Sequence, residues 1–295
     1  MNIIDEIKLS FRHGTALTKL IYINLGVFIL VSLLNVFFFL FNAAGTGHFS
    51  LIDWLAVPAN LNILLIKPWT IVTYMFLHEN FIHILFNMLW LFWFGKIFLQ
   101  FLSEKQLSYV YILGGLTGAA FYILFFNIFP VFDKVLPGSV ALGASASVMA
   151  IVVAISAYAP NYSLNLMFIG NIKLKYIALF TIVLDILSIP SSNSGGHIAH
   201  LGGAFYGYLF AIQMKKGSDL TRSYSRLFES LSSLFRFKKK MKVTHTREMT
   251  DWEYNEEKKK RQERMDIILD KLAKSGYDSL TKEEKQLLFN MSDKK

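Results

Sequence analysis

A serine stands among small residues at the head of an apolar stretch, in the run L-G-A-S-A-S at residues 142–147. A helix over residues 143–159 would extend about 24 Å at 1.5 Å per residue, less than a hydrocarbon core of about 30 Å. The free N–H groups of its first turn could stabilise a developing oxyanion. Ser145 is therefore a candidate nucleophile, although a serine at this place could also be a simple helix cap.

A second candidate group is His200, near the start of another apolar stretch at residues 197–214. This stretch and the serine helix each carry small residues at i, i+4 spacing, so the two helices are expected to pack closely. Close packing would bring His200 beside Ser145. A histidine in a membrane could instead be a proton relay, a ligand or a buried hydrogen-bonding group. The two rows of small residues are Ala199, Gly203, Gly207 and Ala211, and Ala146, Ala150 and Ala154.

His83 and Asn87 are four residues apart in the apolar stretch 78–98, so they share one face of a helix. Both side chains can donate a hydrogen bond. They are therefore candidate donors to a negative oxygen.

No metal site is predicted. His78 and His83 form a near match to the zinc motif H-E-x-x-H, but they are five residues apart, about 140° round a helix. His197 and His200 could face one ion, yet no carboxylate or cysteine stands near them in the sequence.

The composition is that of an integral membrane protein with a soluble tail. Of the 295 residues, 54% are hydrophobic and 17% are charged. The part after Met214 holds 21 of the 30 Lys and Arg residues and 14 of the 21 Asp and Glu residues. There is no cysteine, which excludes disulfides and thiol catalysis. The basic N-terminus precedes an apolar stretch without a small-residue cleavage site, as in a membrane anchor.

We predict an all-α polytopic membrane protein with six transmembrane helices. The expected spans are residues 19–41, 78–98, 107–129, 143–159, 173–189 and 197–214. The positive-inside rule puts both termini in the cytoplasm, because only Lys67 and Lys134 then fall in outer loops. Two short amphipathic pieces, 49–56 and 60–66, are expected in the long connection after the first span.

Four segments are expected along the chain: a cytoplasmic N-terminus (1–16), a six-helix membrane domain (17–215), a basic amphipathic interfacial segment (216–243) and a cytoplasmic helical tail (244–295). Residues 219–237 carry apolar side chains at helical spacing, and the basic cluster at 236–242 would meet anionic lipid rather than nucleic acid. In the tail, Gly276 indicates a helix stop and residues 279–284 a capping box, which together predict a helical hairpin.

These motifs resemble the rhomboid family of intramembrane serine proteases, over about residues 17–215. The family's G-x-S-G on its fourth helix is matched by G-A-S-A at 143–146. Its A-H-x-x-G-x-x-x-G on the sixth helix is matched at 199–207, and its H-x-x-x-N on the second at 83–87.

The resemblance implies a bundle of rhomboid type in which Ser145 is the nucleophile and His200 is the general base and then the acid. The oxyanion hole would consist of the side chains of His83 and Asn87 with the backbone N–H of Ser145. Gly143, Gly203 and Gly207 are expected to be helix-packing glycines. No cofactor, no metal and no third acid are expected.

The sequence departs from the family pattern at three places. Ala146 replaces a glycine beside the nucleophile, Thr70 follows Trp69 where many members have arginine, and Met149 stands where an aromatic residue is common. Asp185 is an acid within the fifth apolar stretch and has no assigned partner. We expect it to make a structural hydrogen bond.

By this resemblance the chain is an intramembrane serine endopeptidase that cuts transmembrane segments of membrane-protein substrates where helix-breaking or small residues free the backbone. The expected location is a bacterial inner membrane. Two alternatives remain: a catalytically silent rhomboid-like protein that binds membrane clients, against which Ser145 and His200 argue, and a six-helix transporter, against which the lack of internal repeats argues.

Overall fold

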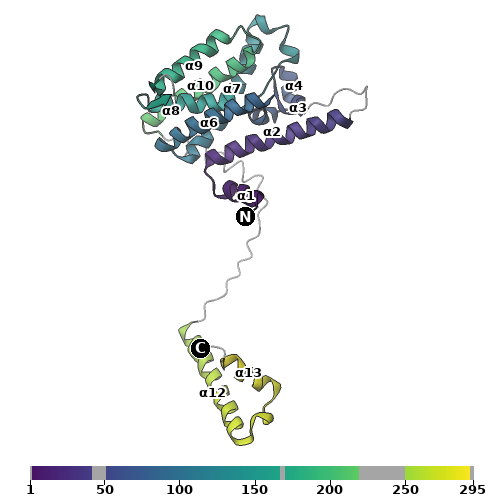
Figure 1. Ribbon diagram of the computed structural model, residues 1–295, viewed down its shortest axis with the longest axis vertical. Coiled ribbons are helices and arrows are strands. Elements are labelled where there is room, and N and C mark those ends of the chain that lie inside the picture. Colours follow the sequence, from purple (N-terminus) through teal and green to yellow (C-terminus); the bar gives the residue numbers. More distant parts are fainter. Residues whose placement is uncertain (1, 42–50, 167–169, 219–249, 293–295) are drawn as a thin grey trace. The chain divides into compact units, whose positions relative to one another are not determined.

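The computed structural model describes residues 2–41, 51–166, 170–218 and 250–292. Most of these residues are helical, as the composition predicts, and two short two-stranded sheets occur among the helices. The chain divides into two compact units, Met1–Phe235 and Arg236–Lys295, and all candidate site residues lie in the first unit (Figure 1).

Among its described residues, the first unit has seven longer helices. Six of them correspond to the predicted spans, with ends that differ by at most three residues. Of these, α2, α6 and α7 are long and apolar enough to cross a membrane, while α8 is a shorter apolar helix. Helix α1, which ends with Arg12 and His13 in its last turn, was not predicted. The helices are α1 (Ile3–His13), α2 (Ala16–Phe41), α6 (Phe81–Phe101), α7 (Glu104–Ile128), α8 (Ser145–Tyr158), α9 (Leu174–Ser188) and α10 (Ser194–Lys215).

Short elements fill the connections. The loop after α2 contains α3 (Leu51–Leu55), α4 (Leu61–Ile66), α5 (Thr70–Thr73) and the 3-10 turn η1 (Tyr74–Phe76), which agrees with the two short pieces expected there. Two further 3-10 turns, η2 (Pro130–Phe132) and η3 (Leu136–Gly138), follow α7. Strand β1 (Val57–Pro58) pairs antiparallel with β2 (Val140–Ala141), so this loop is tied to the segment before Ser145.

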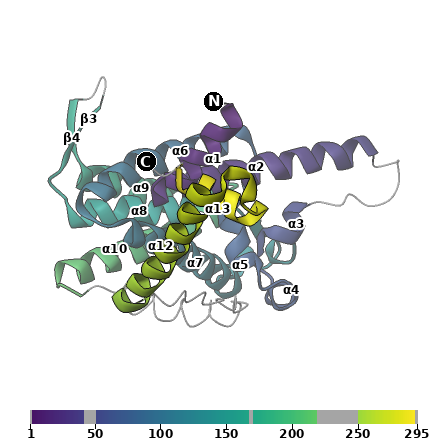
Figure 2. The same cartoon turned by 90° about the horizontal axis from the view of Figure 1, so that it is seen from below.

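A β-hairpin that the sequence did not predict links α8 and α9. Its strands are β3 (Ser163–Leu166) and β4 (Gly170–Lys173), which pair antiparallel from Ser163 opposite Lys173. Figure 2 shows the hairpin projecting from the helices. The predicted fifth stretch therefore begins with a strand residue, Lys173, before α9 starts.

Helix α8 packs against four other helices, α6, α7, α9 and α10, and its most extensive contact is with α10. A Cβ added to Gly203 or Gly207 on α10 would overlap the carbonyl oxygens of Ala146 and Ala150. The predicted close approach of the two rows of small residues is therefore confirmed, since only hydrogen fits at these positions.

Gly143 was wrongly grouped with the packing glycines. It lies before α8 with a φ of +130°, in a region that residues with a Cβ rarely adopt. A Cβ there would also lie 3.0 Å from the ring of His83. Gly143 therefore serves the turn that precedes Ser145.

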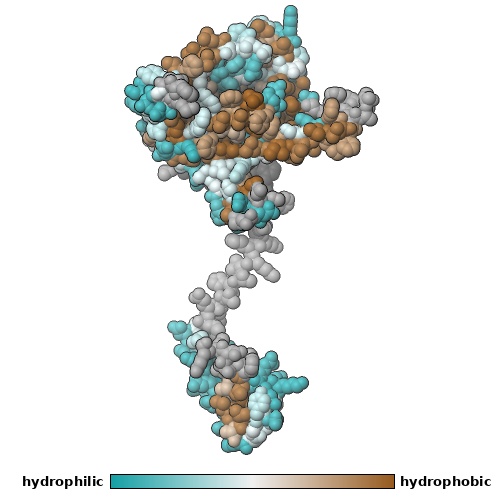
Figure 3. All heavy atoms as spheres, in the orientation of Figure 1, coloured by the Kyte–Doolittle hydropathy of each residue, from teal (hydrophilic) through white to brown (hydrophobic). Residues whose placement is uncertain are grey.

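The exposed surface of α2 is strongly apolar. Figure 3 shows hydrophobic residues, in brown, gathered along α2. Large side chains such as Leu33, Phe39 and Leu40 are 63%, 82% and 69% exposed. Patches of this extent are typical of surfaces covered by lipid.

The second unit is a helical hairpin of α12 (Asp251–Ser275), η4 (Tyr277–Ser279) and α13 (Lys282–Ser292). Gly276 follows α12 with a φ of +75°, and Thr281 and Glu284 form a reciprocal cap, so the predicted helix stop and capping box are confirmed. Lys271 Nζ lies 2.9 Å from Glu284 Oε2 and joins the two helices. The predicted interfacial helix and basic cluster at 219–242 lie outside the described residues.

Candidate active site

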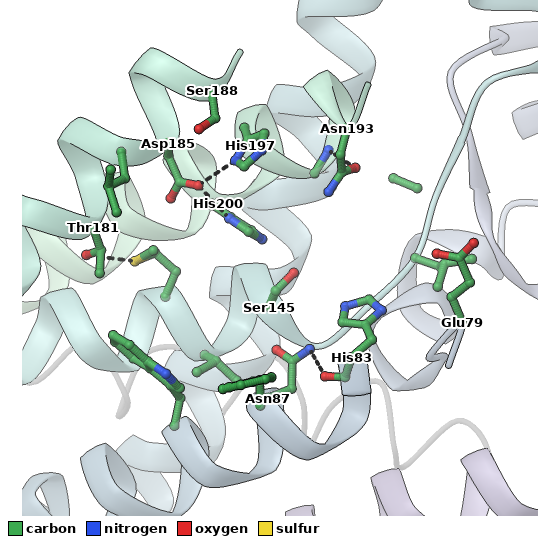
Figure 4. A pocket seen from close by; sticks show the side chains of 18 of the residues that line it. Glu79, His83, Asn87, Ser145, Thr181, Asp185, Ser188, Asn193, His197 and His200 are labelled. Carbon is green, nitrogen blue, oxygen red and sulfur yellow. Dashed lines mark hydrogen bonds and ion pairs between the residues drawn. The ribbon is translucent and has the colours of Figure 1, made fainter. Parts of the chain in front are cut away.

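A pocket of about 960 Å³ is lined by side chains of α6, α8, α9 and α10. It contains all four residues that the sequence singled out, Ser145, His200, His83 and Asn87 (Figure 4). These residues are distant in the sequence and come from three different helices. The helical packing therefore brings a hydroxyl, an imidazole and two potential hydrogen-bond donors to one cavity.

Ser145 is held at the pocket by its loop. The N–H of Gly143 donates to the carbonyl of Tyr74 at 2.9 Å, and the N–H of Ala59 donates to the carbonyl of Ser139 at 3.0 Å. Ser145 is the first residue of α8, and the N-cap is Ala144, which makes no side-chain cap. The alternative in which Ser145 is only a helix cap is therefore wrong.

Ser147 has a different environment. Its side chain is 0% exposed and does not line the pocket. A Cβ added to Gly115 of α7 would lie 2.6 Å from Ser147 Oγ, so this serine faces the α7 backbone. Its Oγ has no hydrogen-bond partner among the described residues. Of the two serines, only Ser145 is available to a ligand in the pocket.

Asp185 of α9 contacts both histidines at the start of α10. Its Oδ1 lies 2.9 Å from Nδ1 of His200 and 2.8 Å from Nδ1 of His197. Asp185 is 6% exposed, and its Oδ2 is buried without a hydrogen-bond partner in the described part of the chain. The expected structural hydrogen bond of Asp185 is present. Its partners include His200, the candidate base, so a carboxylate lies beside that ring.

The bond to Asp185 defines which nitrogen of His200 can react. A carboxylate accepts hydrogen bonds, so Nδ1 carries the proton and Nε2 is left as the acceptor. Figure 4 shows His200 lying between Asp185 and Ser145. No hydrogen bond joins Ser145 Oγ to His200 within the described residues, and such bonds often tighten only when substrate binds.

Asp185, His197 and His200 form a cluster of a kind that could hold a metal ion. One ligand atom from each of Asp185, His197 and His200 lies within 4.8 Å of the other two. A carboxylate does accompany the two histidines, contrary to the prediction, because α9 brings Asp185 beside them from 12 and 15 residues away in the sequence. Both contacts have the lengths of ordinary charge-assisted hydrogen bonds, which already explain the cluster without an ion.

His83 and Asn87 line the pocket from the first two turns of α6. Asn80 caps this helix by accepting from the N–H of His83 at 2.8 Å, which places the ring at the helix start. Asn87 Nδ2 donates to the carbonyl of His83 at 2.9 Å. That bond uses one of two amide protons, so the second can serve an oxygen in the pocket.

His78 is a neighbour of His83, and its predicted place on the same helix is wrong. It lies before α6, which begins at Phe81, so the angle between helical positions does not apply to it. The rings of His78 and His83 pack edge to face with centroids 5.2 Å apart. Both ring nitrogens of His78 are buried without a hydrogen-bond partner in the described chain. His78 therefore supports the ring of His83 by packing.

The first loop is hydrogen-bonded without an arginine after Trp69. Thr70 Oγ1 donates to the carbonyl of Lys67 at 2.6 Å, and Trp69 Nε1 donates to the carbonyl of Trp54 at 2.9 Å. Lys67 Nζ lies 4.6 Å from the centre of the Trp54 ring. Met149 lines the pocket with its sulfur 3.8 Å from Thr181 Oγ1, and as an aliphatic residue it offers no ring to stack on a histidine.

Comparison with known proteins gives three matches. The family model of the Rhomboid domain matches residues 66–216, and the model of a family of unknown function matches residues 249–294. RHOMBOID-like protein 12, mitochondrial, of Arabidopsis thaliana is 29% identical over 157 residues, which are 50% of this chain and 47% of that protein. The match thus spans about half the length of the relative. Its mitochondrial name gives no support to the predicted bacterial location.

Proposed function

The chain belongs to the rhomboid family, and from that premise we propose that it is an intramembrane serine endopeptidase that cuts transmembrane segments of membrane proteins. One observation carries the proposal. Ser145, His200, His83 and Asn87 all line one pocket, which thus combines a candidate nucleophile, a candidate base and two hydrogen-bond donors. The acyl-transfer chemistry of serine hydrolysis needs these parts.

In the proposed reaction Ser145 Oγ attacks the scissile carbonyl carbon while Nε2 of His200 takes the hydroxyl proton. The tetrahedral intermediate then collapses, the C–N bond breaks, and His200 gives the proton to the departing amine. Water repeats the sequence on the acyl-enzyme and regenerates Ser145.

The negative oxygen of the tetrahedral intermediate would accept hydrogen bonds from the side chains of His83 and Asn87 and from the N–H of Ser145. As the first residue of α8, Ser145 has an N–H without an intrahelical acceptor. Donors already oriented in a pocket stabilise the oxyanion without reorganisation, which is typically the largest electrostatic term in such catalysis.

We further propose that the six longer apolar helices α2, α6, α7, α8, α9 and α10 all lie in the membrane, with both termini cytoplasmic and the pocket open on the opposite side. The support is the long apolar α2, α6 and α7 together with the distribution of Lys and Arg. Reporter fusions at residue 47 and after Met214 test this topology. A cytoplasmic reporter at 47, or an external one after Met214, would contradict it.

The proposed partners are transmembrane protein substrates and, at the basic residues 236–242, anionic lipid. No cofactor, metal or nucleic acid enters the proposal. The substrate segment would need small or helix-breaking residues, because a regular helix keeps its carbonyls in backbone hydrogen bonds.

The rival function is a catalytically silent protein that binds membrane clients. The absence of a hydrogen bond between Ser145 and His200 among the described residues favours it, and the relative from Arabidopsis thaliana is itself named rhomboid-like. Purified protein in lipid vesicles with a transmembrane model substrate distinguishes the two. Cleavage by the wild type and none by Ser145→Ala supports the protease. Binding without cleavage by the folded wild type supports the rival.

A further inference from the structure

We propose that Asp185 is the positioning acid of His200, so that this chain uses a Ser145–His200–Asp185 triad; the inference rests on the proposed protease function. The carboxylate reaches the histidine from α9, a helix that contributes no other reacting group. Its Oδ1 lies 2.9 Å from Nδ1 of His200.

The first consequence of this contact concerns the tautomer. Neutral imidazole carries its proton on either nitrogen, and only the form with a bare Nε2 can accept the proton of Ser145. A carboxylate acceptor at Nδ1 selects that form and fixes the plane of the ring. The same arrangement orients the base in the serine proteases of soluble folds.

The second consequence is electrostatic. Proton transfer turns His200 into an imidazolium, and a carboxylate 2.9 Å away stabilises this charge in a site that is largely shielded from water. The Asp185 side chain is 8% exposed and that of His200 is 20% exposed, so water screens the pair weakly. The stabilisation arises only as the reaction proceeds, so it acts on the chemical step rather than on substrate binding.

Burial of Asp185 is costly unless it is compensated. Its Oδ2 has no hydrogen-bond partner in the described chain, so both compensating bonds fall on Oδ1. The second of these comes from His197, one turn before His200, at 2.8 Å. His197 therefore holds the carboxylate in place, while His200 is the ring that Figure 4 shows on the side of Ser145.

Three variants test the inference in the full-length protein. Asp185→Ala removes both the acceptor and the charge, Asp185→Asn keeps the shape and an acceptor oxygen but removes the charge, and Asp133→Asn makes the same chemical change at an exposed loop residue. Cleavage of a transmembrane model substrate gives kcat and KM. A fluorophosphonate probe gives the rate and the final extent of serine labelling.

The triad predicts that Asp185→Ala lowers kcat by about 10³-fold or more and Asp185→Asn by at least about tenfold, with KM unchanged. Labelling should become slower but reach the wild-type extent, because every folded molecule still contains a reactive serine. A merely structural acid would instead reduce the labelled fraction and leave the rate of each labelled site unchanged. Asp133→Asn should match the wild type.

Three results would overturn the inference: a kcat of Asp185→Ala equal to that of the wild type, a loss confined to the labelled fraction, or abolition of wild-type cleavage by a chelator with recovery in zinc. Where Asp185→Ala does not fold, the isosteric Asp185→Asn decides. Each of these leaves the protease function standing, whereas cleavage by Ser145→Ala removes that function itself.

Discussion

Ser145 and Ser147 are two residues apart on α8, about 200° round the helix, and the same side chain has opposite surroundings at the two positions. Ser145 lines a pocket that also holds an imidazole and two amide or imidazole donors. Ser147 faces Gly115 of α7 and is 0% exposed, without a hydrogen-bond partner among the described residues. One face of the helix borders the pocket, and the other packs against α7.

The contrast shows what places a hydroxyl at the pocket in this fold. Ser147 is more deeply buried, but it does not line the pocket that contains His200. Ser145 shares its pocket with His200 because α10 packs closely against α8. The close approach depends in turn on Gly203 and Gly207, which lie against the α8 backbone.

The largest effect is expected on the pocket face. Ser145→Ala and His200→Ala should each abolish cleavage, because nucleophilic attack and proton transfer are successive uses of one pair. The double variant should be hardly worse than either single variant, since residues that act as a unit do not contribute additively. Rates measured with a transmembrane model substrate check this. Additive losses would mean that the two side chains work independently.

The donors on α6 should matter less than the reacting pair. His83→Ala and Asn87→Ala should each leave measurable activity, reduced by about 10² to 10³ in kcat, because one lost oxyanion donor leaves others in place. His78→Phe, which keeps a ring against His83, is the matched control and should lose less. A variant of Asn87 with the full wild-type kcat would remove it from the oxyanion hole.

The packing of α8 is tested by adding a methyl group. Gly203→Ala forces a Cβ onto the carbonyl oxygen of Ala146, and overpacking of this kind costs about 1–3 kcal/mol of folding free energy. Gly26→Ala on α2 is the control, because no atom lies within 4 Å of its added Cβ. Unfolding in mixed micelles measures the folding free energies of the two variants. Equal stabilities would show that the two helices are not in such close contact.

The smallest effect is expected in the second unit, at Glu284 of the tail. The N–H of Thr281, and then Lys271, lower the pKa of this carboxyl below its usual value. Its contribution to the hairpin is thus present at neutral pH and is lost as the pH falls through the lowered pKa. Glu284→Gln should speed amide exchange at residues 281–285 at pH 7, with a difference from the wild type that shrinks as the pH falls through the lowered pKa, and should leave cleavage unchanged. Slower cleavage would link the tail to the site.

The sequence predicted those parts of the site that depend on residues close together in the chain. Ser145 at a small-residue turn, His83 and Asn87 on one helix face, and the small rows of α8 and α10 are all local patterns of spacing. The contact between Asp185 and His200 joins two helices, and only its unusual position as an acid in an apolar stretch pointed to it. Likewise, His78 was misjudged because helix periodicity was applied to a residue that lies outside the helix.

For the fold as well, the sequence predicted the helices but not the contacts between residues far apart in the chain. Apolar stretches located the longer helices within three residues, because burial or lipid contact along a whole helix leaves a continuous signal. The pairing of Val57 with Ala141 joins residues far apart in the chain through backbone bonds, which no side-chain pattern records. The β3–β4 hairpin was missed because each strand has only four residues, too few for an alternation of polar and apolar side chains to stand out.

The most direct test of the central claim compares the two serines in one experiment. Wild type, Ser145→Ala and Ser147→Ala are purified, treated with a fluorophosphonate probe, and assayed with the same transmembrane substrate. We expect Ser147→Ala to be labelled and to cleave at about the wild-type rate, and Ser145→Ala to do neither while remaining folded. Labelling and cleavage by Ser145→Ala together with their loss in Ser147→Ala would contradict the account.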